Sequence, residues 1–254
     1  MNKDMVNILG VDIFSFGWDE FIKKIKIILR SKKRYCYIIS ATSVHGVIEA
    51  QSDRKFKRIF QKQYITYADG LPLKIIGRIA GEKKIEQIKG PEVLPEVCKL
   101  TSTINIKHFF YGGKEGTADK LALNLIKRYP GLKVVGTYCP PFRELTETEK
   151  IEITDIINKS RADIVWVGLS TPKQEKWADE FSKYLNTKII FTVGAAFDFH
   201  TGGIKFAPAW VSRIGLEWLF RLILEPKRLW PRYSRIVPKF IWLSILQILK
   251  VKKY

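Results

Sequence analysis

The chain has 254 residues, 46% of them hydrophobic, which predicts one sizeable folded core with a short appendage and excludes a disordered chain. The formal net charge is +19 and the pI is about 9.8, which favours a phosphate-rich partner: nucleic acid, anionic lipid headgroups or a nucleoside diphosphate. Three scattered cysteines without a CxxC pair indicate neither a disulfide framework nor a zinc knuckle, and residues 1–17 lack the apolar stretch of a signal peptide, so we expect a reducing, cytoplasmic compartment.

The first third of the chain begins with a β-α-β pattern. Apolar runs at residues 8–13 and 35–39 predict buried strands on either side of a helix, whose apolar residues recur at helical spacing. Residues 44–60 predict one further helix. A strand at 64–67 then stops at a turn signal, Asp69-Gly70, which places the Asp69 carboxylate just past a strand end.

The same alternation continues through the middle of the chain. Thr146 and Glu149 have the spacing of a capping box at a helix start. Strands alternating with helices predict an α/β fold with a Rossmann-like parallel sheet and crossover helices over residues 1–204. The further strands are predicted at residues 107–111, 133–137, 163–167 and 188–193, and the further helices at 117–128, 146–159 and 172–184.

Residues 205–254 have a different composition, with eleven Lys or Arg residues against two acidic ones. Tryptophans and prolines alternate there with arginines, which predicts a basic and aromatic appendage of short helices. The final stretch, residues 236–251, is apolar for about fifteen residues but is interrupted by Lys239 and Gln247. A transmembrane helix needs about 20 apolar residues. We therefore expect an interfacial helix that associates with an anionic membrane surface.

Candidate ligand-binding residues follow the predicted strands, because in parallel sheets ligands bind beyond the carboxyl ends of the strands. Two groups of residues share this edge: the glycine-rich turns and the start of the 172–184 helix. The glycine turns can cradle a diphosphate or can simply be tight turns, and an acidic residue in the first turn of a helix is also what the helix dipole prefers. The candidates are Gly112, Gly113, Gly168, Gln174, Glu175 and Gly194.

Asp69 is the candidate general base, because a carboxylate after a strand can reach into a cleft and remove a proton from a hydroxyl. Aspartates before glycine are also ordinary turn residues. His45 and His200 have no partner at metal-ligand spacing, and the chain has no Asp-x-Asp, so we predict neither a metal site nor a cofactor. The tail arginines can neutralise a leaving diphosphate directly, or they form only a solvated, lipid-facing basic surface.

Taken together, these motifs resemble the WecG/TagA/CpsF family of bacterial glycosyltransferases, also called glycosyltransferase family 26. The resemblance covers essentially the whole chain. Its blocks are YADGLPL at 67–73, GPE at 90–92, FYGG at 110–113, VGLSTPKQEKW at 167–177, VGAAFD at 193–198, APAW at 207–210, GLEWLFR at 215–221 and EPKR at 225–228, with Arg232 and Tyr233 beyond.

The resemblance implies an inverting enzyme of cell-envelope polysaccharide assembly, which uses a UDP-hexose or UDP-N-acetylhexosamine and a polyprenyl-diphosphate-linked acceptor at the cytoplasmic face of the membrane. Asp69 matches the family's candidate base, and Gln174 and Glu175 match its nucleotide-sugar pair. Asp198 falls within the VGAAFD block of the same predicted site. The tail residues that match those thought to close over the diphosphate are Arg221, Arg228 and Arg232.

One segment departs from the family pattern. Family members carry a Thr-x-Asn element after the second strand, whereas residues 40–45 here are SATSVH. We expect Thr42 or Ser43 to make that polar contact instead.

Two other functions fit parts of the sequence. A nucleic-acid-binding protein would also carry a high positive charge and a basic, aromatic tail. The candidate residues at one sheet edge and the apolar final helix argue against it, so nucleic acid is not an expected partner. A dinucleotide-dependent oxidoreductase would need GxGxxG and an acidic residue about 20 positions later, and the chain lacks this combination. We favour the transferase, with residues 1–204 as its core and 205–254 for active-site closure and membrane association.

Overall fold

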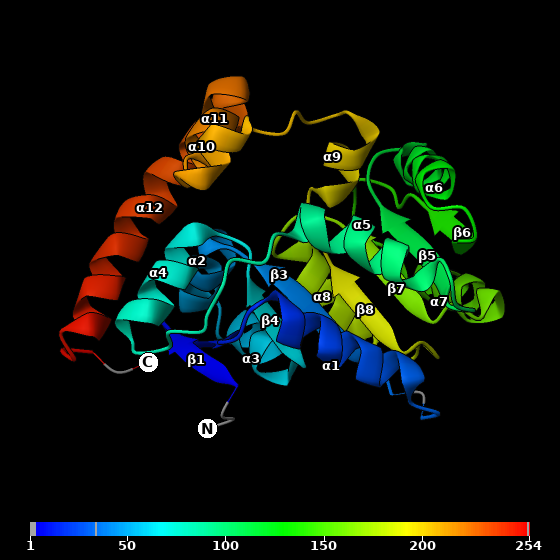
Figure 1. The fold of residues 1–254 in the computed structure, drawn as a ribbon, viewed down its shortest axis with the longest axis horizontal. Helices are drawn as coiled ribbons and strands as arrows, with labels where there is room; N and C mark the ends of the chain where they lie inside the picture. Colours follow the sequence, from blue (N-terminus) through cyan, green and yellow to red (C-terminus); the bar gives the residue numbers. More distant parts are fainter. Residues whose placement is uncertain (1–3, 34, 253) are drawn as a thin grey trace.

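A computed structural model describes residues 4–33, 35–252 and 254, and a six-stranded sheet forms its centre (Figure 1). All neighbouring strands are parallel, in the order β4-β3-β8-β7-β5-β6, and helices connect them. The predicted α/β fold with crossover helices is therefore confirmed. The strands are β3 (Tyr37–Thr42), β4 (Ile65–Ala68), β5 (Lys107–Gly112), β6 (Lys133–Tyr138), β7 (Ile164–Gly168) and β8 (Ile189–Thr192).

Helices cover both faces of this sheet, because successive side chains of a strand point to opposite faces. Phe110 and Trp166 pack in one buried cluster with α1, α5, α6 and α9, whereas Phe109 and Val165 pack in another with α7 and α8. Strands buried on both faces explain their nearly continuous apolar sequences. The helices named here are α1 (Trp18–Arg30), α5 (Gly90–Thr101), α6 (Thr117–Arg128), α7 (Glu147–Ser160), α8 (Lys173–Phe181) and α9 (Ala196–Thr201).

The N-terminal prediction of a single strand over residues 8–13 is wrong. That segment lies in an antiparallel hairpin of β1 (Met5–Ile8) and β2 (Val11–Phe14), which forms a separate two-stranded sheet. Leu9 and Gly10 form the turn with φ values of 51° and 76°, the left-handed conformation that two-residue hairpin turns need. The first β-α-β unit of the sheet therefore begins at β3.

The predicted helix over residues 44–60 is in fact two helices, α2 (Val44–Ser52) and α3 (Arg54–Lys62). Asp53 interrupts them because its carboxylate accepts a 3.0 Å hydrogen bond from the backbone N–H of Phe56, which caps α3. No element was predicted for residues 70–106, which carry α4 (Leu71–Ile79) as well as α5.

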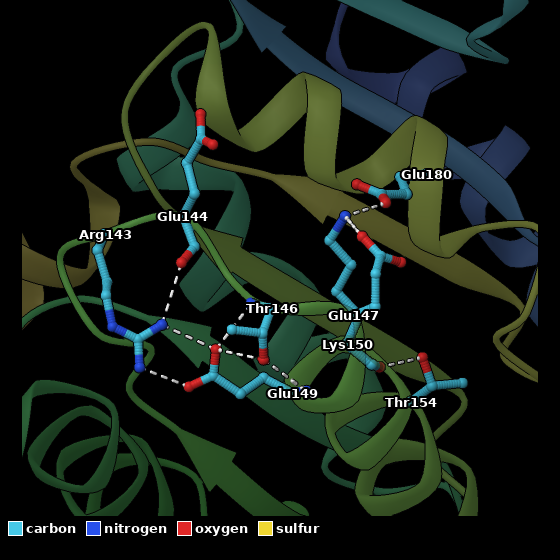
Figure 2. A network of polar contacts seen from close by, with 8 residues as sticks. All are labelled: Arg143, Glu144, Thr146, Glu147, Glu149, Lys150, Thr154 and Glu180. Atoms are coloured by element: carbon cyan, nitrogen blue, oxygen red, sulfur yellow. Dashed lines mark hydrogen bonds and ion pairs between the residues drawn. The ribbon is translucent and has the colours of Figure 1, made fainter.

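The predicted capping box of α7 is confirmed, and it belongs to a wider polar network (Figure 2). Thr146 and Glu149 each bond the other's backbone N–H, at 3.2 and 2.8 Å, and Arg143 binds Glu149 through two nitrogens at 2.8 and 2.7 Å. Lys150 joins α7 to α8 through Glu180 at 2.7 Å. This network fixes the loop after β6 and the start of α7.

The basic tail forms α10 (Ala209–Arg213), α11 (Glu217–Leu224) and the 23-residue helix α12 (Pro226–Ile248). The expectation of short helices is thus wrong for α12, which passes through Pro231 and Pro238. A stripe of buried side chains on α12, including Ile236 and Phe240, packs on α2, and this packing offsets the cost of the prolines. Within the described residues, no helix is long and apolar enough to cross a membrane.

The far end of α12 is tied to the N-terminal hairpin. The Gln247 side chain accepts a hydrogen bond from Leu9 N and donates one to Asn7 O, both at 2.9 Å. Figure 1 shows α12 running along one side of the molecule, with α10 and α11 at its upper end above α4 and α2. The tail is therefore held against the rest of the protein at both ends.

Candidate active site

The carboxyl ends of the strands place the predicted residues along one edge of the sheet. Thr42 ends β3, and Asp69 directly follows β4. Gly112 and Gly168 end β5 and β7, and Gly194 lies two residues beyond the end of β8. Because the strands are parallel, these positions share the edge at which ligands bind in such folds.

Asp69 is held by hydrogen bonds from three segments. Its backbone N–H donates to Thr42 O at 2.9 Å, and its backbone carbonyl accepts from the Gln87 side chain at 2.8 Å. Oδ1 of its carboxylate accepts from the N–H of Gly90, the first residue of α5, at 2.7 Å. Among the described residues, no hydrogen bond involves Oδ2. One carboxylate oxygen is thus fixed, and the other is free to take a proton.

Burial raises the pKa of Asp69 from 3.8 to about 6, and the hydrogen bond from Gly90 opposes this rise. Three charges contribute less: Glu217 raises the pKa further, while Arg221 and Lys89 lower it. A carboxylate with a pKa near neutrality is a better proton acceptor than an ordinary aspartate and remains largely ionised at pH 7. Asp69 therefore has the position and the basicity of a general base.

The tail supplies two of those charges. Glu217 and Arg221 are four residues apart on α11, so they share one face of the helix. The Arg221 guanidinium lies over the Phe199 ring of α9, 5.5 Å from its centroid. The charge of Arg221 acts on Asp69 and also on Asp198 of α9, so this residue of the tail lies near both acidic groups.

The three predicted arginines are close enough to influence one another. Burial lowers the pKa of Arg232, and the neighbouring charges of Arg228 and Arg221 lower it further. Glu225 pairs with Arg228 and, at 3.7 Å, with Arg221. Cations this close together repel one another, so the cluster has room for an additional anion. Clustered guanidinium groups suit a diphosphate in particular, because each can bind it through two nitrogens.

Asp198 lies at the same cluster. Burial raises its pKa, and the charges of Arg228, Lys114 and Arg221 oppose the rise, in that order. Lys114 belongs to the glycine-rich turn after β5, so the predicted turn and the tail arginines face the same carboxylate.

Gln174 and Glu175 are brought to the edge but are turned into the protein. Both side chains are buried, and Gln174 Nε2 donates to Glu175 Oε1 at 2.9 Å. Gln174 Oε1 accepts from the N–H of Gly194 at 2.9 Å, and Thr171 donates to Glu175 Oε1 at 2.8 Å. The pair ties the start of α8 to the loop after β8. Burial raises the pKa of Glu175, and its hydrogen bonds from Gln174 and Thr171 oppose that rise.

A comparison with known protein families decides the identity. The family described as "Glycosyl transferase WecG/TagA/CpsF family" matches residues 6–254. The chain belongs to this family. It is therefore a glycosyltransferase, as the motifs predicted.

Curated relatives agree with the family assignment, and the three described next all carry the name N-acetylglucosaminyldiphosphoundecaprenol N-acetyl-beta-D-mannosaminyltransferase. The protein of Bacillus subtilis (strain 168) is 26% identical over 85% of this chain and 81% of its own length. That of Bacillus spizizenii is 22% identical over 87% and 83%. That of Staphylococcus aureus (strain MRSA252) is 22% identical over 99% of this chain and 96% of its own length.

The two residues expected to replace the family's Thr-x-Asn contact differ in accessibility. Thr42 is buried, and its hydroxyl has no hydrogen-bond partner among the described residues, whereas Ser43 is half-buried at the start of α2. The Ser43 hydroxyl makes no capping bond with α2. In this transferase Ser43 is thus the more accessible of the two hydroxyls.

The glycines at the edge have packing reasons of their own. A Cβ on Gly112 would lie 2.6 Å from the Gly168 carbonyl oxygen, and one on Gly168 would lie 2.5 Å from the Phe197 ring. Gly113 has φ 79°, and a Cβ there would press on Thr117. Close approach of β5 to β7 accounts for Gly112, and close approach of α9 to β7 accounts for Gly168, in both cases without a ligand.

Several site residues carried no signal in the sequence analysis. The Gln87 side chain donates a hydrogen bond to the Asp69 carbonyl, and the charge of Lys89 lowers the pKa of Asp69. Both are ordinary polar residues in a segment without a predicted element. Glu217 lies inside the GLEWLFR block but had no predicted role. The only available signal was the GPE block at 90–92, which marks the segment that positions Asp69 without indicating how it does so.

Proposed function

We propose that this glycosyltransferase transfers an N-acetylhexosamine, specifically N-acetylmannosamine, from a UDP-sugar to a polyprenyl-diphosphate-linked acceptor in cell-surface polysaccharide synthesis. The observation that carries the proposal is that the charge of Arg221 in the tail influences the pKa of Asp69, which is about 6. One oxygen of the Asp69 carboxylate is held by the N–H of Gly90. A base and a cation at one sheet edge are what a transfer with an anionic leaving group needs. The sugar and the acceptor follow the names of the relatives.

The proposed reaction is a single displacement. Asp69 Oδ2 takes the proton of the acceptor hydroxyl, whose oxygen attacks the anomeric carbon from the face opposite UDP. The bond from that carbon to the diphosphate oxygen breaks, and the electron pair leaves with UDP. Because a nucleotide sugar of α configuration then gives a β product, the "beta" in the relatives' names supports inversion.

The leaving diphosphate is proposed to bind among Arg221, Arg228 and Arg232. The charges of Arg228 and Arg221 lower the pKa of Arg232, and Glu225 pairs with Arg221 and Arg228 only, so a dianion would relieve the repulsion among the three cations. The other proposed donor-site residues share the sheet edge with Asp198. They are Thr42, Ser43, Gly112, Gly113, Gly168, Gln174, Glu175 and Gly194.

Gln174 and Glu175 serve the donor site in this proposal by fixing the loop after β8, since both side chains are buried and bonded to their neighbours. Asp198 and Ser43 are the more exposed polar groups available to the nucleotide sugar.

We further propose that the tail, residues 205–254, holds the enzyme at the cytoplasmic face of the membrane as a peripheral protein. Large apolar side chains are exposed on all three tail helices and on α4, and the tail carries a strong excess of basic residues. Apolar contact together with cations near anionic headgroups suffices for reversible membrane binding. The exposed side chains are Ile75, Ile79, Trp210, Ile214, Trp218, Ile223, Leu224, Trp230, Ile241, Trp242, Ile245 and Ile248.

The test is a panel of UDP-sugars with polyprenyl-diphosphate-linked N-acetylglucosamine, in which UDP release and the anomeric configuration of the product are measured. We expect turnover with UDP-N-acetylmannosamine, a β linkage, and activity that persists in EDTA, because arginines supply the charge for the leaving group. An α product would exclude the single displacement. Loss of activity in EDTA that magnesium restores would exclude the metal-free mechanism, and salt-dependent DNA binding without any transfer would favour the nucleic-acid alternative.

A further inference from the structure

Lys89 connects the tail to the segment that orients Asp69. Its Nζ donates to Ser212 Oγ at 2.6 Å and to Glu217 Oε1 at 2.9 Å, and it lies 3.5 Å from Glu92 Oε1. Ser212 also donates to Glu217 Oε1 at 2.7 Å, so the three side chains close a small network. Ser212 belongs to α10 and Glu217 to α11, so this one lysine holds both short tail helices.

The backbone around Lys89 holds Asp69 at the same time. Ile88 N–H donates to Ala68 O at 2.9 Å, Gln87 binds the Asp69 carbonyl, and Gly90 N–H binds Asp69 Oδ1. Lys89 thus stands between two residues that bond Asp69. A displacement of Lys89 would therefore be transmitted to Asp69 through the neighbouring residues Ile88 and Gly90, whose backbone N–H groups bond Ala68 O and Asp69 Oδ1.

The tail residues held by Lys89 also determine where Arg221 lies. Glu217, which receives the Lys89 hydrogen bond, is one turn before Arg221 on α11. Gly215, in the turn between α10 and α11, has φ 75°, and a Cβ on it would lie 2.1 Å from Leu71 of α4, so the turn is seated directly on the core. The position of Arg221 over the site therefore depends on this attachment.

We propose that Lys89 is a positioning residue: it latches the tail closed over the active site and couples that closure to the orientation of Asp69. This inference deepens the proposed function and rests on it only for its kinetic consequences. The Lys89 side chain is one-fifth exposed and that of Glu217 about one-third, so the pair is partly shielded from water. Removing one partner of such a pair leaves the other charge without its hydrogen bonds, which is why the latch can be opened by a single substitution.

The structural arm of the test measures amide hydrogen exchange in Lys89→Met, Ser212→Ala and Lys89→Arg. We expect exchange in residues 209–224 to rise about tenfold in Lys89→Met and less in Ser212→Ala, while residues 117–128 of α6 are unchanged. Lys89→Arg keeps the charge and should restore part of the protection. Lys99→Met is the matched control, because Lys99 is an exposed lysine in the last turn of α5, the helix for which Lys89 is the N-cap residue.

The kinetic arm separates positioning from a merely structural role. The titratable and charged groups that act on Asp69 are Glu217, Arg221 and Lys89, with Tyr67 on the strand before it. Lys89→Met removes a cation and should move the acid limb of the kcat/KM profile to higher pH, and Glu217→Gln removes an anion and should move it to lower pH. We also expect Lys89→Met to lower kcat/KM about tenfold or more through misplacement of Asp69 and Arg221.

The exchange experiment and the kinetic experiment test different parts of the proposal. If the protein transfers no sugar, the exchange experiment still tests the latch. Exchange in residues 209–224 that is the same in Lys89→Met and in the wild type would overturn the proposal. Exchange that rises equally throughout the chain would overturn it as well, because Lys89 would then support general stability. Shifts of the acid limb in the same direction for both variants would exclude the coupling to Asp69.

Discussion

The backbone N–H of Gly90 donates a 2.7 Å hydrogen bond to Oδ1 of Asp69, and no described residue makes a hydrogen bond to Oδ2. The bond fixes the plane of the carboxylate while it leaves one oxygen available. Gly90 is suited to this role because a Cβ there would come within 3.1 Å of the Val193 carbonyl oxygen and 3.5 Å of Oδ1 itself. A larger residue would push α5 away from the carboxylate it holds.

Asp69→Asn should lower kcat about 10²-fold or more with little change in donor binding, the scale expected for loss of a general base. In the wild type, kcat/KM should fall as the pH drops below about 6, because the base must be ionised and its pKa is about 6. Isothermal titration with UDP measures donor binding, and a pH profile of turnover measures the loss of rate and its dependence on pH. Near-normal turnover by Asp69→Asn would remove Asp69 from the mechanism.

The same substitution should stabilise the fold. The pKa of Asp69 is higher in the folded protein than in the unfolded chain. Its contribution to the free energy of unfolding is therefore most favourable below pH 3.8 and is lost as the pH rises through about 6. A difference of about two pKa units corresponds to at most about 3 kcal/mol. Asp69→Asn should therefore raise the free energy of unfolding at pH 8 by about 1–3 kcal/mol, with the gain vanishing below pH 4. Urea unfolding of both proteins at pH 8 and below pH 4 measures the difference in the free energy of unfolding. An equal difference at both pH values would show that the gain does not come from the ionisation of Asp69.

Arg221→Ala should lower kcat about 10²-fold or more even with a soluble acceptor analogue, because it removes a cation placed for the leaving diphosphate. Arg221→Lys should recover only part of the rate, since an ammonium group cannot bind a phosphate through two nitrogens. Arg213→Ala is the control: Arg213 is an exposed arginine of α10, and its loss should leave the rate within about twofold. If both alanine variants lose activity equally, general tail charge rather than Arg221 is responsible.

Gln174→Ala should lower the free energy of unfolding by about 1–3 kcal/mol, because it leaves the Gly194 N–H without its acceptor. Donor KM should rise as well, since the loop after β8 loosens. Gln61→Ala, which changes an exposed glutamine of α3, should do neither. Urea unfolding and donor titration are measured together. Weaker donor binding with unchanged stability would instead mean that Gln174 contacts the donor directly.

Trp242→Ser should reduce co-sedimentation with anionic vesicles about tenfold, because an exposed aromatic side chain would no longer enter the membrane interface. Binding should also weaken with salt, as expected for basic residues near anionic headgroups. Leu123→Ser is the control, since Leu123 is 68% exposed against 60% for Trp242 but lies on α6, across the sheet from the tail (Figure 1). Equal losses in the two variants would show that the tail helix is not the contact.

Local patterns determined most of the regular elements. The helix over residues 117–128 and the capping box at Thr146 and Glu149 were predicted as observed, because helical spacing and capping depend on residues a few positions apart. The β1–β2 hairpin was missed because its turn needs two left-handed residues, and Leu9 gives no sign of adopting that conformation. The prolines of α12 signalled a break that did not occur.

The sequence by itself determined the parallel α/β class, the edge that carries Asp69 and the glycine turns, and the basic tail. Only the tertiary structure decided that Gln174 and Glu175 face inward and that Trp242 is exposed on α12. It also decided that Lys89 binds Ser212 and Glu217, which lie 123 and 128 positions away. Contacts over such separations leave no periodic or spacing signal, because they depend on how whole elements pack rather than on neighbouring residues.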